Sequence, residues 1–151
     1  MLGSLTRVAE NAIGLNQSKI LVRIWKDSEV EEFIIDLNRV SQLFEKGVDS
    51  EDDVFGLYAS NQGRVSFKGK TKDKKRNSRI ALFDTGGFYK TFDVKVSNDG
   101  FKITANDKKG DDSLTEKYGK EILGLTDESK RELIDKILPI LIKDVREELA
   151  K

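Results

Sequence analysis

The stretch FDVKVSNDGFKITAN, residues 92–106, decides the fold class of this chain. Apolar and polar residues alternate on both sides of Asn98-Asp99-Gly100, whose residues tolerate the positive φ of a tight turn. Because a period of two places alternate side chains on one face of a strand, the stretch predicts an antiparallel hairpin at about 92–105, with one buried and one wet face. The alternating apolar residues are Phe92, Val94, Val96, Phe101, Ile103 and Ala105.

Helical patterns precede the hairpin. An apolar stripe with a helical period runs through residues 30–44, with Ser28 as the expected cap and Gly47 as the expected stop. Residues 5–13 have the spacing of a short amphipathic helix. Residues 18–25 fit one face of a helix, although a strand also fits them. The first third of the chain therefore predicts N-terminal helices.

A second helical region follows the hairpin. Ser113 and Glu116 have the spacing of a capping box for a short helix. Thr126 is expected to cap a long final helix, whose apolar positions line one side as far as Leu149. Pro139 lies inside this helix and cannot donate its amide, so it is expected to kink the helix or divide it in two.

The order of these patterns predicts one α+β domain covering residues 1–151. N-terminal helices come first, a small antiparallel sheet follows, and a long C-terminal helix kinked at Pro139 ends the chain. Further strands are predicted at 54–60, 63–69 and 79–83.

The composition of the 151 residues excludes several kinds of chemistry. Cysteine and histidine are both absent, which removes disulfides, thiol chemistry, the usual general base and the commonest metal ligand. We therefore expect no cofactor and no metal. The formal net charge is +0, so bulk charge does not attract a polyanion. No apolar stretch approaches the roughly 20 residues of a membrane span and no secretory signal pattern is present, so we expect a protein made in a cytoplasm, without a membrane partner.

Two clusters of opposite charge indicate contacts with partners. The stretch KGKTKDKKRNSR has almost no apolar residues and is predicted to be a loop or mobile arm at about 68–79, which contacts DNA or a neighbouring subunit. A solvated loop is the simpler interpretation, and the lack of aromatic residues argues against stacking on single strands. Its cations are Lys68, Lys70, Lys72, Lys74, Lys75, Arg76 and Arg79. The acidic cluster, which either pairs with a neighbour's basic loop or keeps a turn hydrated, consists of Asp49, Glu51, Asp52 and Asp53.

The triplet Asp84-Thr85-Gly86, which follows an apolar run, has two interpretations. Asp-Thr-Gly is typical of aspartic proteases, in which two carboxylates share a proton, and a chain with one copy would act as a homodimer. The helical ends of the chain and the bulky residues after Gly87 argue against a protease. We expect a turn instead, because Asp and Thr favour turns and both Gly86 and Gly87 permit positive φ.

Three segments resemble the small neck and tail-completion proteins of tailed bacteriophages. The first carries the pattern Leu82, Thr85-Gly86, Phe88 and Thr91-Phe92. The others are residues 37–58 and YGKEILGLT, residues 118–126, which precedes the final helix. The resemblance implies a non-enzymatic structural subunit of the virion, similar to head–tail connector or tail terminator proteins, that forms a homo-oligomeric ring at the neck or tail. It also implies other neck or tail proteins as partners, contact with DNA in the lumen, and synthesis in the host bacterial cytoplasm.

Two further features of the sequence concern the contacts that a ring of subunits would need. The final helix is apolar at nearly every position from Ile137 to Ile142, which predicts burial on more than one side, by the sheet and by another subunit. Trp25 is expected either to anchor an interface or to belong to the core. The leading hypothesis is therefore a ring subunit of a phage virion. The alternatives are a nucleic-acid-binding module that uses residues 68–79 and a homodimeric aspartic protease that uses Asp84.

Overall fold

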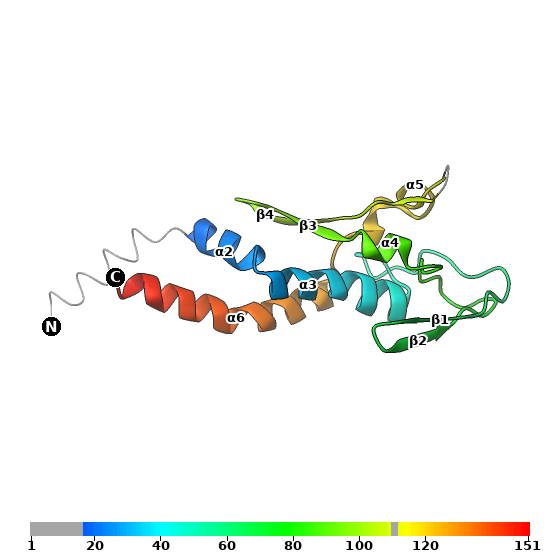
Figure 1. Ribbon diagram of the computed structural model, residues 1–151, viewed down its shortest axis with the longest axis horizontal. Helices are drawn as coiled ribbons and strands as arrows, with labels where there is room; N and C mark the ends of the chain where they lie inside the picture. Colours follow the sequence, from blue (N-terminus) through cyan, green and yellow to red (C-terminus); the bar gives the residue numbers. More distant parts are fainter. Residues whose placement is uncertain (1–16, 110–111) are drawn as a thin grey trace.

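The structure, a computed structural model, describes residues 17–109 and 112–151. The helix predicted over residues 5–13 lies outside the described residues. The described chain is elongated, with the C-terminal helix toward one end and two short hairpins and several loops toward the other (Figure 1). Helices, then strands, then helices follow one another, so the predicted α+β class is confirmed.

The bounds of the elements are as follows. The helices are α2 (Gln17–Trp25), α3 (Ser28–Asp36), the π-helix η1 (Leu37–Lys46), α4 (Gly87–Lys90), α5 (Leu114–Tyr118), the 3-10 helix η2 (Lys120–Ile122) and α6 (Asp127–Leu149). The strands are β1 (Arg64–Phe67), β2 (Lys70–Asp73), β3 (Asp93–Ser97), β4 (Gly100–Thr104), β5 (Lys108–Lys109) and β6 (Asp112–Ser113). They pair as three antiparallel ladders, β1 with β2, β3 with β4 and β5 with β6.

The predicted hairpin is confirmed as β3 and β4. Val94 pairs with Ile103, and both side chains are buried, whereas Lys95 and Lys102 on the other face are exposed. The hairpin lies beside α2 and α3 (Figure 1). The ring of Trp25 on α2 meets the ring of Phe101 on β4 edge to face, with centroids 4.9 Å apart, so Trp25 packs against the hairpin within its own chain.

The helix predicted over residues 30–44 is formed by α3 and η1 together. Its cap is Asp27 rather than Ser28, because the Asp27 carboxylate accepts hydrogen bonds from the amides of Glu29 and Val30 at 3.0 and 3.2 Å. The predicted stop is confirmed, since η1 ends at Gly47, which adopts a left-handed conformation with φ of 64°.

Gly47→Ala is expected to lower the free energy of unfolding by about 1–2 kcal/mol more than Gly63→Ala does. Both glycines have positive φ, 64° and 83°, so either alanine pays a similar backbone strain of about 1 kcal/mol. A Cβ at Gly47 would lie 2.6 Å from the Cβ of Arg79, whereas a Cβ at Gly63 would meet nothing within 4 Å. Chemical denaturation of the two variants measures the difference, and equal losses would contradict the close approach at Gly47.

The final helix, α6, begins and bends where the sequence predicts. The Thr126 hydroxyl accepts a hydrogen bond from the amide of Ser129 at 3.1 Å, which caps its first turn. Pro139 lies inside α6, and the helix is bent. Ile137 is buried, but Leu138 and Ile142 are 45% and 42% exposed, so the predicted burial on more than one side is not achieved within the single chain. None of the helices described is long and apolar enough to cross a membrane.

The strands predicted at 54–60 and 79–83 are wrong. These segments meet at a single bridge between Leu57 and Arg79 and do not form a ladder. The second segment cannot stay extended, because Leu82 adopts a positive φ of 57° and turns the chain. The strand predicted at 63–69 is confirmed as β1.

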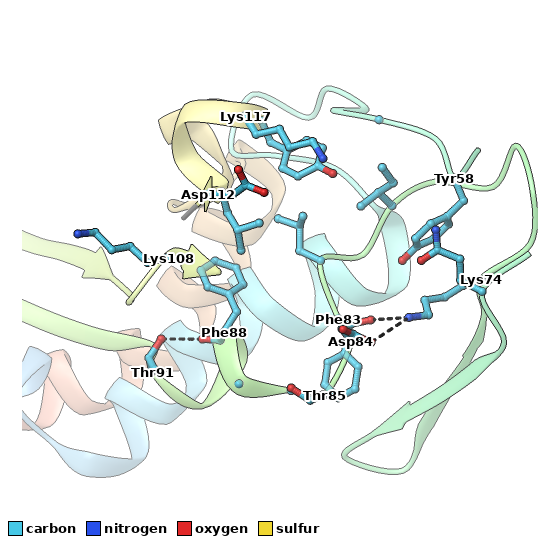
Figure 2. A pocket seen from close by; sticks show the side chains of 18 of the residues that line it. Tyr58, Lys74, Phe83, Asp84, Thr85, Phe88, Thr91, Lys108, Asp112 and Lys117 are labelled. Carbon is cyan, nitrogen blue, oxygen red and sulfur yellow. Dashed lines mark hydrogen bonds and ion pairs between the residues drawn. The ribbon is translucent and has the colours of Figure 1, made fainter. Parts of the chain in front are cut away.

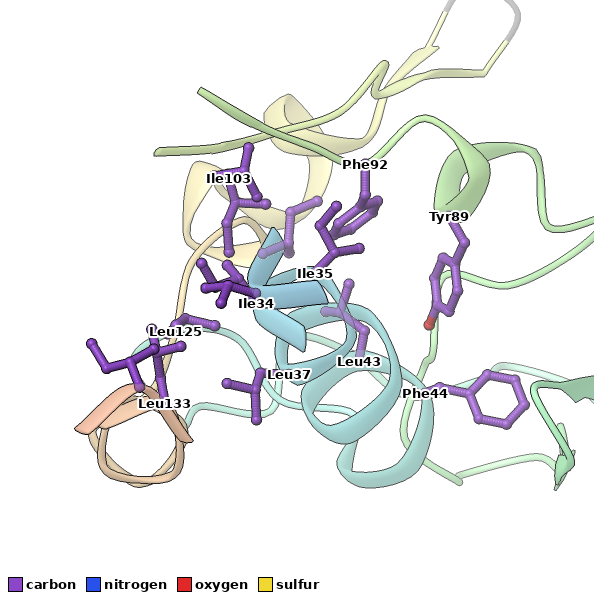
Figure 3. Packing of buried hydrophobic residues seen from close by; sticks show 14 of the residues in the cluster. Ile34, Ile35, Leu37, Leu43, Phe44, Tyr89, Phe92, Ile103, Leu125 and Leu133 are labelled. Carbon is purple, nitrogen blue, oxygen red and sulfur yellow. The ribbon is translucent and has the colours of Figure 1, made fainter. Parts of the chain in front are cut away.

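The core lies where α3 and η1 face the hairpin, α4 and α6. Figure 3 shows Ile34 and Leu37 pointing toward the side of Leu125 and Leu133, while Phe44 lies with Tyr89 on the opposite side of the helix. Residues of α3 and η1 buried in this cluster include Val30, Ile34, Leu43 and Phe44, and buried residues from the rest of the chain include Ala81, Tyr89, Val94, Ile103, Ile122 and Leu133. One continuous core thus joins the helices to the segment that carries residues 81–92.

Candidate functional site

A groove of about 870 Å³ opens at the end of the molecule that carries α4, β1 and β2. Residues 56–62, residues 80–91 and, from a third part of the chain, residues 106–108 and 112–118 line it, and Lys74 also contributes (Figure 2). The whole Asp84-Thr85-Gly86-Gly87 motif lies in its wall. This groove is the candidate functional site.

The Asp84 motif forms the predicted turn. Residues 84–86 bend the chain, and α4 begins at Gly87. Gly86 adopts a positive φ of 85°, and a Cβ at this position would approach the ring of Phe83 to 3.1 Å, so the turn requires glycine for two reasons. The Asp84 side chain is 63% exposed and points into solvent at the rim of the groove.

Lys74 ties the Asp84 turn to the segment that precedes it. Its side chain is only 5% exposed, and its Nζ donates a hydrogen bond of 3.1 Å to the carbonyl oxygen of Phe83. The same Nζ lies 4.0 Å from Oδ1 of Asp84 (Figure 2). The basic segment and the Asp84 motif, which are separate features of the sequence, are therefore in contact in the structure.

The prediction of a loop or mobile arm at 68–79 is wrong for its middle part, whereas residues 74–78 belong to no helix or strand, as a loop would. Residues 70–73 form β2, which pairs with β1. Lys68 forms ion pairs with Glu32 and Asp36 of α3, the second at 2.6 Å, and Lys70 Nζ lies 2.7 Å from a carboxylate oxygen of Glu45. The segment lacks apolar residues because ion pairs with η1 and α3, rather than a buried apolar face, hold it in place.

The other cations of the segment differ in their surroundings. Loss of water around the Lys72 ammonium, together with the nearby charge of Arg79, lowers the pKa of Lys72. The Arg79 guanidinium donates a hydrogen bond of 3.2 Å to the carbonyl oxygen of Lys46. Lys75 and Arg76 are exposed. The structure therefore does not present the seven cations as one continuous basic surface.

The acidic cluster is also divided. Asp49 is buried, and its Oδ1 accepts hydrogen bonds from the amides of Glu51 and Asp53 at 2.9 and 3.0 Å, so this carboxylate shapes its own loop. Glu51, Asp52 and Asp53 are exposed. A smaller hollow of about 350 Å³ places Glu51 and Asp52 near Asp127 and Glu128 at the start of α6. Among residues 17–109 and 112–151, no group of three or more acidic side chains is placed to hold a metal ion.

Asp107 organises the wall of the groove opposite the Asp84 turn. Its Oδ2 accepts hydrogen bonds from the hydroxyls of Ser113 and Thr115, the first at 2.6 Å, and from the amide of Thr115 at 3.2 Å. The hydroxyl donors on Ser113 and Thr115 lower the pKa of Asp107 to about 2. Ser113 also caps α5 by accepting from the amide of Glu116, as the sequence predicts.

The stability that the Asp107 carboxylate contributes is expected to be lost in acid. Because its folded-state pKa is depressed, the contribution is complete above the ordinary aspartate value near 3.9 and disappears as the pH falls toward about 2. Wild type should therefore exceed Asp107→Asn in melting temperature at pH near 6, and the gap should close between about pH 4 and pH 2. Thermal unfolding of both proteins across this range measures it, and a gap that does not change with pH would contradict the charged network.

The groove combines apolar and charged groups in a way that suits a polypeptide ligand. Leu57, which is 53% exposed, and the half-buried Phe88 and Tyr118 supply apolar surface. Lys108 and Lys117 supply positive charge at its rim. Sequence reasoning found the Asp84 side of the groove but missed the wall formed by residues 106–108 and 112–118, since nothing in the spacing of these residues indicates that they face the Asp84 turn.

The chain matches no family model, and a search of curated proteins and of solved structures gives no match for it either.

Proposed function

We propose that this chain is a non-enzymatic structural subunit of a tailed-phage virion, in which its copies form a ring at the neck or tail. One observation carries the proposal: exposed apolar side chains gather at two separate places on an elongated molecule. The resemblance of residues 37–58, 82–92 and 118–126 to neck and tail-completion proteins supplies the virion as the setting, with other neck or tail proteins as further partners.

The two places lie far apart along the molecule. In the part of the chain that the structure describes, the exposed large apolar side chains are Val54, Leu57, Ile134, Leu138 and Ile142. Leu57 lines the groove and Val54 precedes it by three residues, whereas the other three lie along α6, which runs toward the opposite end (Figure 1). Apolar surface that stays exposed in one chain is typical of a contact with another chain.

Two different surfaces at opposite ends favour head-to-tail contacts between copies. A contact of this kind is heterologous, and it closes into a ring when its rotation divides a full turn. A specific interface needs to bury at least about 1,000 Å² in total.

The two alternative functions have less support. A nucleic-acid-binding module would need available cations, but Lys68, Lys70 and Lys74 are paired with carboxylates of their own chain. An aspartic protease would need a second carboxylate beside Asp84, which the other copy of a homodimer would have to supply, whereas within the chain the ammonium of Lys74 lies 4.0 Å from Asp84.

Asp84→Asn is expected to leave particle assembly intact and to lower the free energy of unfolding by at most about 1 kcal/mol, because the side chain is exposed and its ion pair with Lys74 is long. Wild type is expected to cleave no peptide at acid pH. Pepstatin-sensitive cleavage that disappears in Asp84→Asn would establish the protease alternative in place of the structural one.

Imaging of virions that carry this chain tests the proposal. The expected result is a ring of identical copies in the density of the neck or tail. A single copy per particle, or no density for the chain at either place, would overturn it. Closure can require a neighbouring virion protein as a template, so the assembled particle rather than the dilute protein is the object to image.

A further inference from the structure

We propose that the exposed apolar face of α6 in one copy lies in the groove beside the Asp84 turn of the next copy. This face, the α6 stripe, consists of Ile134, Leu138 and Ile142. The inference rests on the proposed function, because it names the two surfaces through which a ring of this chain would be joined.

The α6 stripe has the geometry of a helix that binds in a groove. Its residues are spaced four apart, so they lie one above another along the helix and span about 12 Å at 1.5 Å per residue. They are 55%, 45% and 42% exposed, in contrast to Leu133 and Ile137 of the same helix, which are buried. Amphipathic helices that dock into apolar grooves use anchors with this spacing.

The groove is suited to receive such a helix. Its volume of about 870 Å³ falls within the range of roughly 300–1,000 Å³ for binding sites in proteins. Leu57 at its edge is the most exposed large apolar residue outside α6 in the described chain, and the rings of Phe88 and Tyr118 continue the apolar surface. The Lys74–Phe83 hydrogen bond and the Asp107 network hold its two walls in place before any partner binds.

Charges border both surfaces, and each surface offers the other a charge of opposite sign. Arg131 and Asp135 follow the α6 stripe on its solvent side, since each lies three or four residues from Ile134 or Leu138. The rim of the groove carries Lys108, Lys117 and Asp112, which are also exposed. Both surfaces therefore present an apolar centre with charges of both signs around it, as specific interfaces do.

A second copy, rather than the same chain, is the occupant. The groove lies at the end of the molecule that carries α4, and α6 runs from the middle toward the other end, so one chain cannot fill its own groove with its own stripe (Figure 1). Two copies joined in this way still offer one unfilled groove and one uncovered stripe between them. The contact therefore continues from copy to copy until a ring closes.

Cross-linking between two single-cysteine variants tests the contact, because the natural chain has no cysteine. One variant carries Leu57→Cys in the groove, and its partner carries Leu138→Cys on the stripe. Both positions are exposed, so neither change removes core packing. With a short bis-maleimide reagent, the mixture is expected to yield cross-linked heterodimers. The control replaces either variant with Lys95→Cys, which lies on the exposed face of the β3–β4 hairpin.

A second change checks that the α6 stripe itself enters the groove. Placing Leu138→Lys in a chain that carries Ile142→Cys should lower its cross-linking to Leu57→Cys at least about tenfold, because the new ammonium would replace an apolar contact and meet the cations Lys108 and Lys117 of the groove. Leu138→Met in the same background preserves the apolar surface and should leave the yield unchanged.

The outcomes separate this inference from the proposed function. If cross-links between two Leu138→Cys chains exceed the mixed product, the α6 stripe pairs with itself. If the mixed yield is no higher than that of the Lys95→Cys control, the α6 stripe does not enter the groove. Either result overturns the inference. A ring in the virion without the mixed cross-link would leave the proposed function standing. The mixed cross-link without a ring in the virion would retain the contact and remove the virion role.

Discussion

Tyr89→Ala is expected to lower the free energy of unfolding by about 3–5 kcal/mol, the cost of truncating a large buried aromatic side chain. Tyr89 has no exposed surface. Its ring centroid lies 5.0 Å from that of Phe83 and 5.3 Å from that of Phe67, and the ring of Phe44 lies 6.3 Å away, all in edge-to-face arrangements. The substitution would leave a cavity where η1, the β1–β2 hairpin and the Asp84 segment meet.

A second substitution at this position isolates the hydroxyl. The Tyr89 hydroxyl donates a hydrogen bond to the carbonyl oxygen of Ala81, which is itself fully buried. Tyr89→Phe keeps the ring but leaves this oxygen without its donor, so it is expected to cost about 1–3 kcal/mol. The same hydrogen bond helps to hold the strand-like segment before the Asp84 turn against α4.

Tyr89 also makes stability sensitive to alkali. Burial raises the pKa of the Tyr89 hydroxyl well above its ordinary value. Above about pH 10 the unfolded chain releases this proton while the folded chain keeps it, so stability falls as the pH rises. Urea denaturation of wild type and Tyr89→Phe between pH 7 and about 11 should show a smaller alkaline loss in the variant. Parallel curves, or a loss below 1 kcal/mol for Tyr89→Ala, would contradict this description of the core.

The double variant Asn38→Ala/Gln42→Ala is the second change with a large expected effect, about 3–5 kcal/mol. Asn38 donates to the carbonyl of Ile122 at 2.9 Å and accepts from the amide of Gly124 at 2.8 Å. Gln42, one helical turn later, donates to the carbonyl of Gly124 at 2.8 Å and accepts from the amide of Thr126 at 2.9 Å. Together the two amides satisfy four backbone groups in the connection that leads into α6.

The cost arises because these backbone groups lie in the interior. Removing both side chains leaves buried or partly buried amides and carbonyls without partners, each at roughly 1–3 kcal/mol, and water would have to enter to replace them. Each single variant should lose part of this stability, and the two losses are not expected to sum to the loss of the double variant, since both side chains hold the same segment.

A matched control uses a glutamine of the same type on the surface. Gln62 is exposed, so Gln62→Ala is expected to change the free energy of unfolding by no more than about 0.5 kcal/mol. Chemical denaturation of the single and double variants beside this control measures the effect. A double variant as stable as Gln62→Ala would mean that the connection before α6 does not depend on these hydrogen bonds.

Local patterns were enough to predict several elements. The alternation in residues 92–105 and its Asn98-Asp99-Gly100 turn involve neighbours in sequence, and β3 and β4 form there. The caps at Ser113 and Thr126 likewise depend on amides only three residues away, and both hydrogen bonds form. The bend at Pro139 follows from a missing amide in the residue itself. These features need no information from the rest of the chain.

Other features depend on residues far away in sequence, and single-sequence patterns carry little of this information. Residues 70–73 form a strand by pairing with β1, although their composition predicts a loop, and Lys68 and Lys70 form ion pairs with carboxylates on α3 and η1 more than twenty residues earlier. Nothing around Asn38 or Gln42 indicates that they bind the backbone of residues 122–126. The composition of a segment shows how much apolar surface it can bury. Which group forms a hydrogen bond or ion pair with a buried polar side chain depends on the tertiary structure.

The groove illustrates the same division. The turn at Asp84 follows from Asp, Thr and Gly in succession, which is a local preference for positive φ and hydrogen-bonding side chains. The walls that make it a groove come from residues 56–62, 106–108 and 112–118, which only the tertiary structure brings beside the turn. Backbone propensity acts over a few residues, so the turn could be predicted from the sequence. The groove exists because packing joins segments as far apart in the sequence as Gly56 and Tyr118.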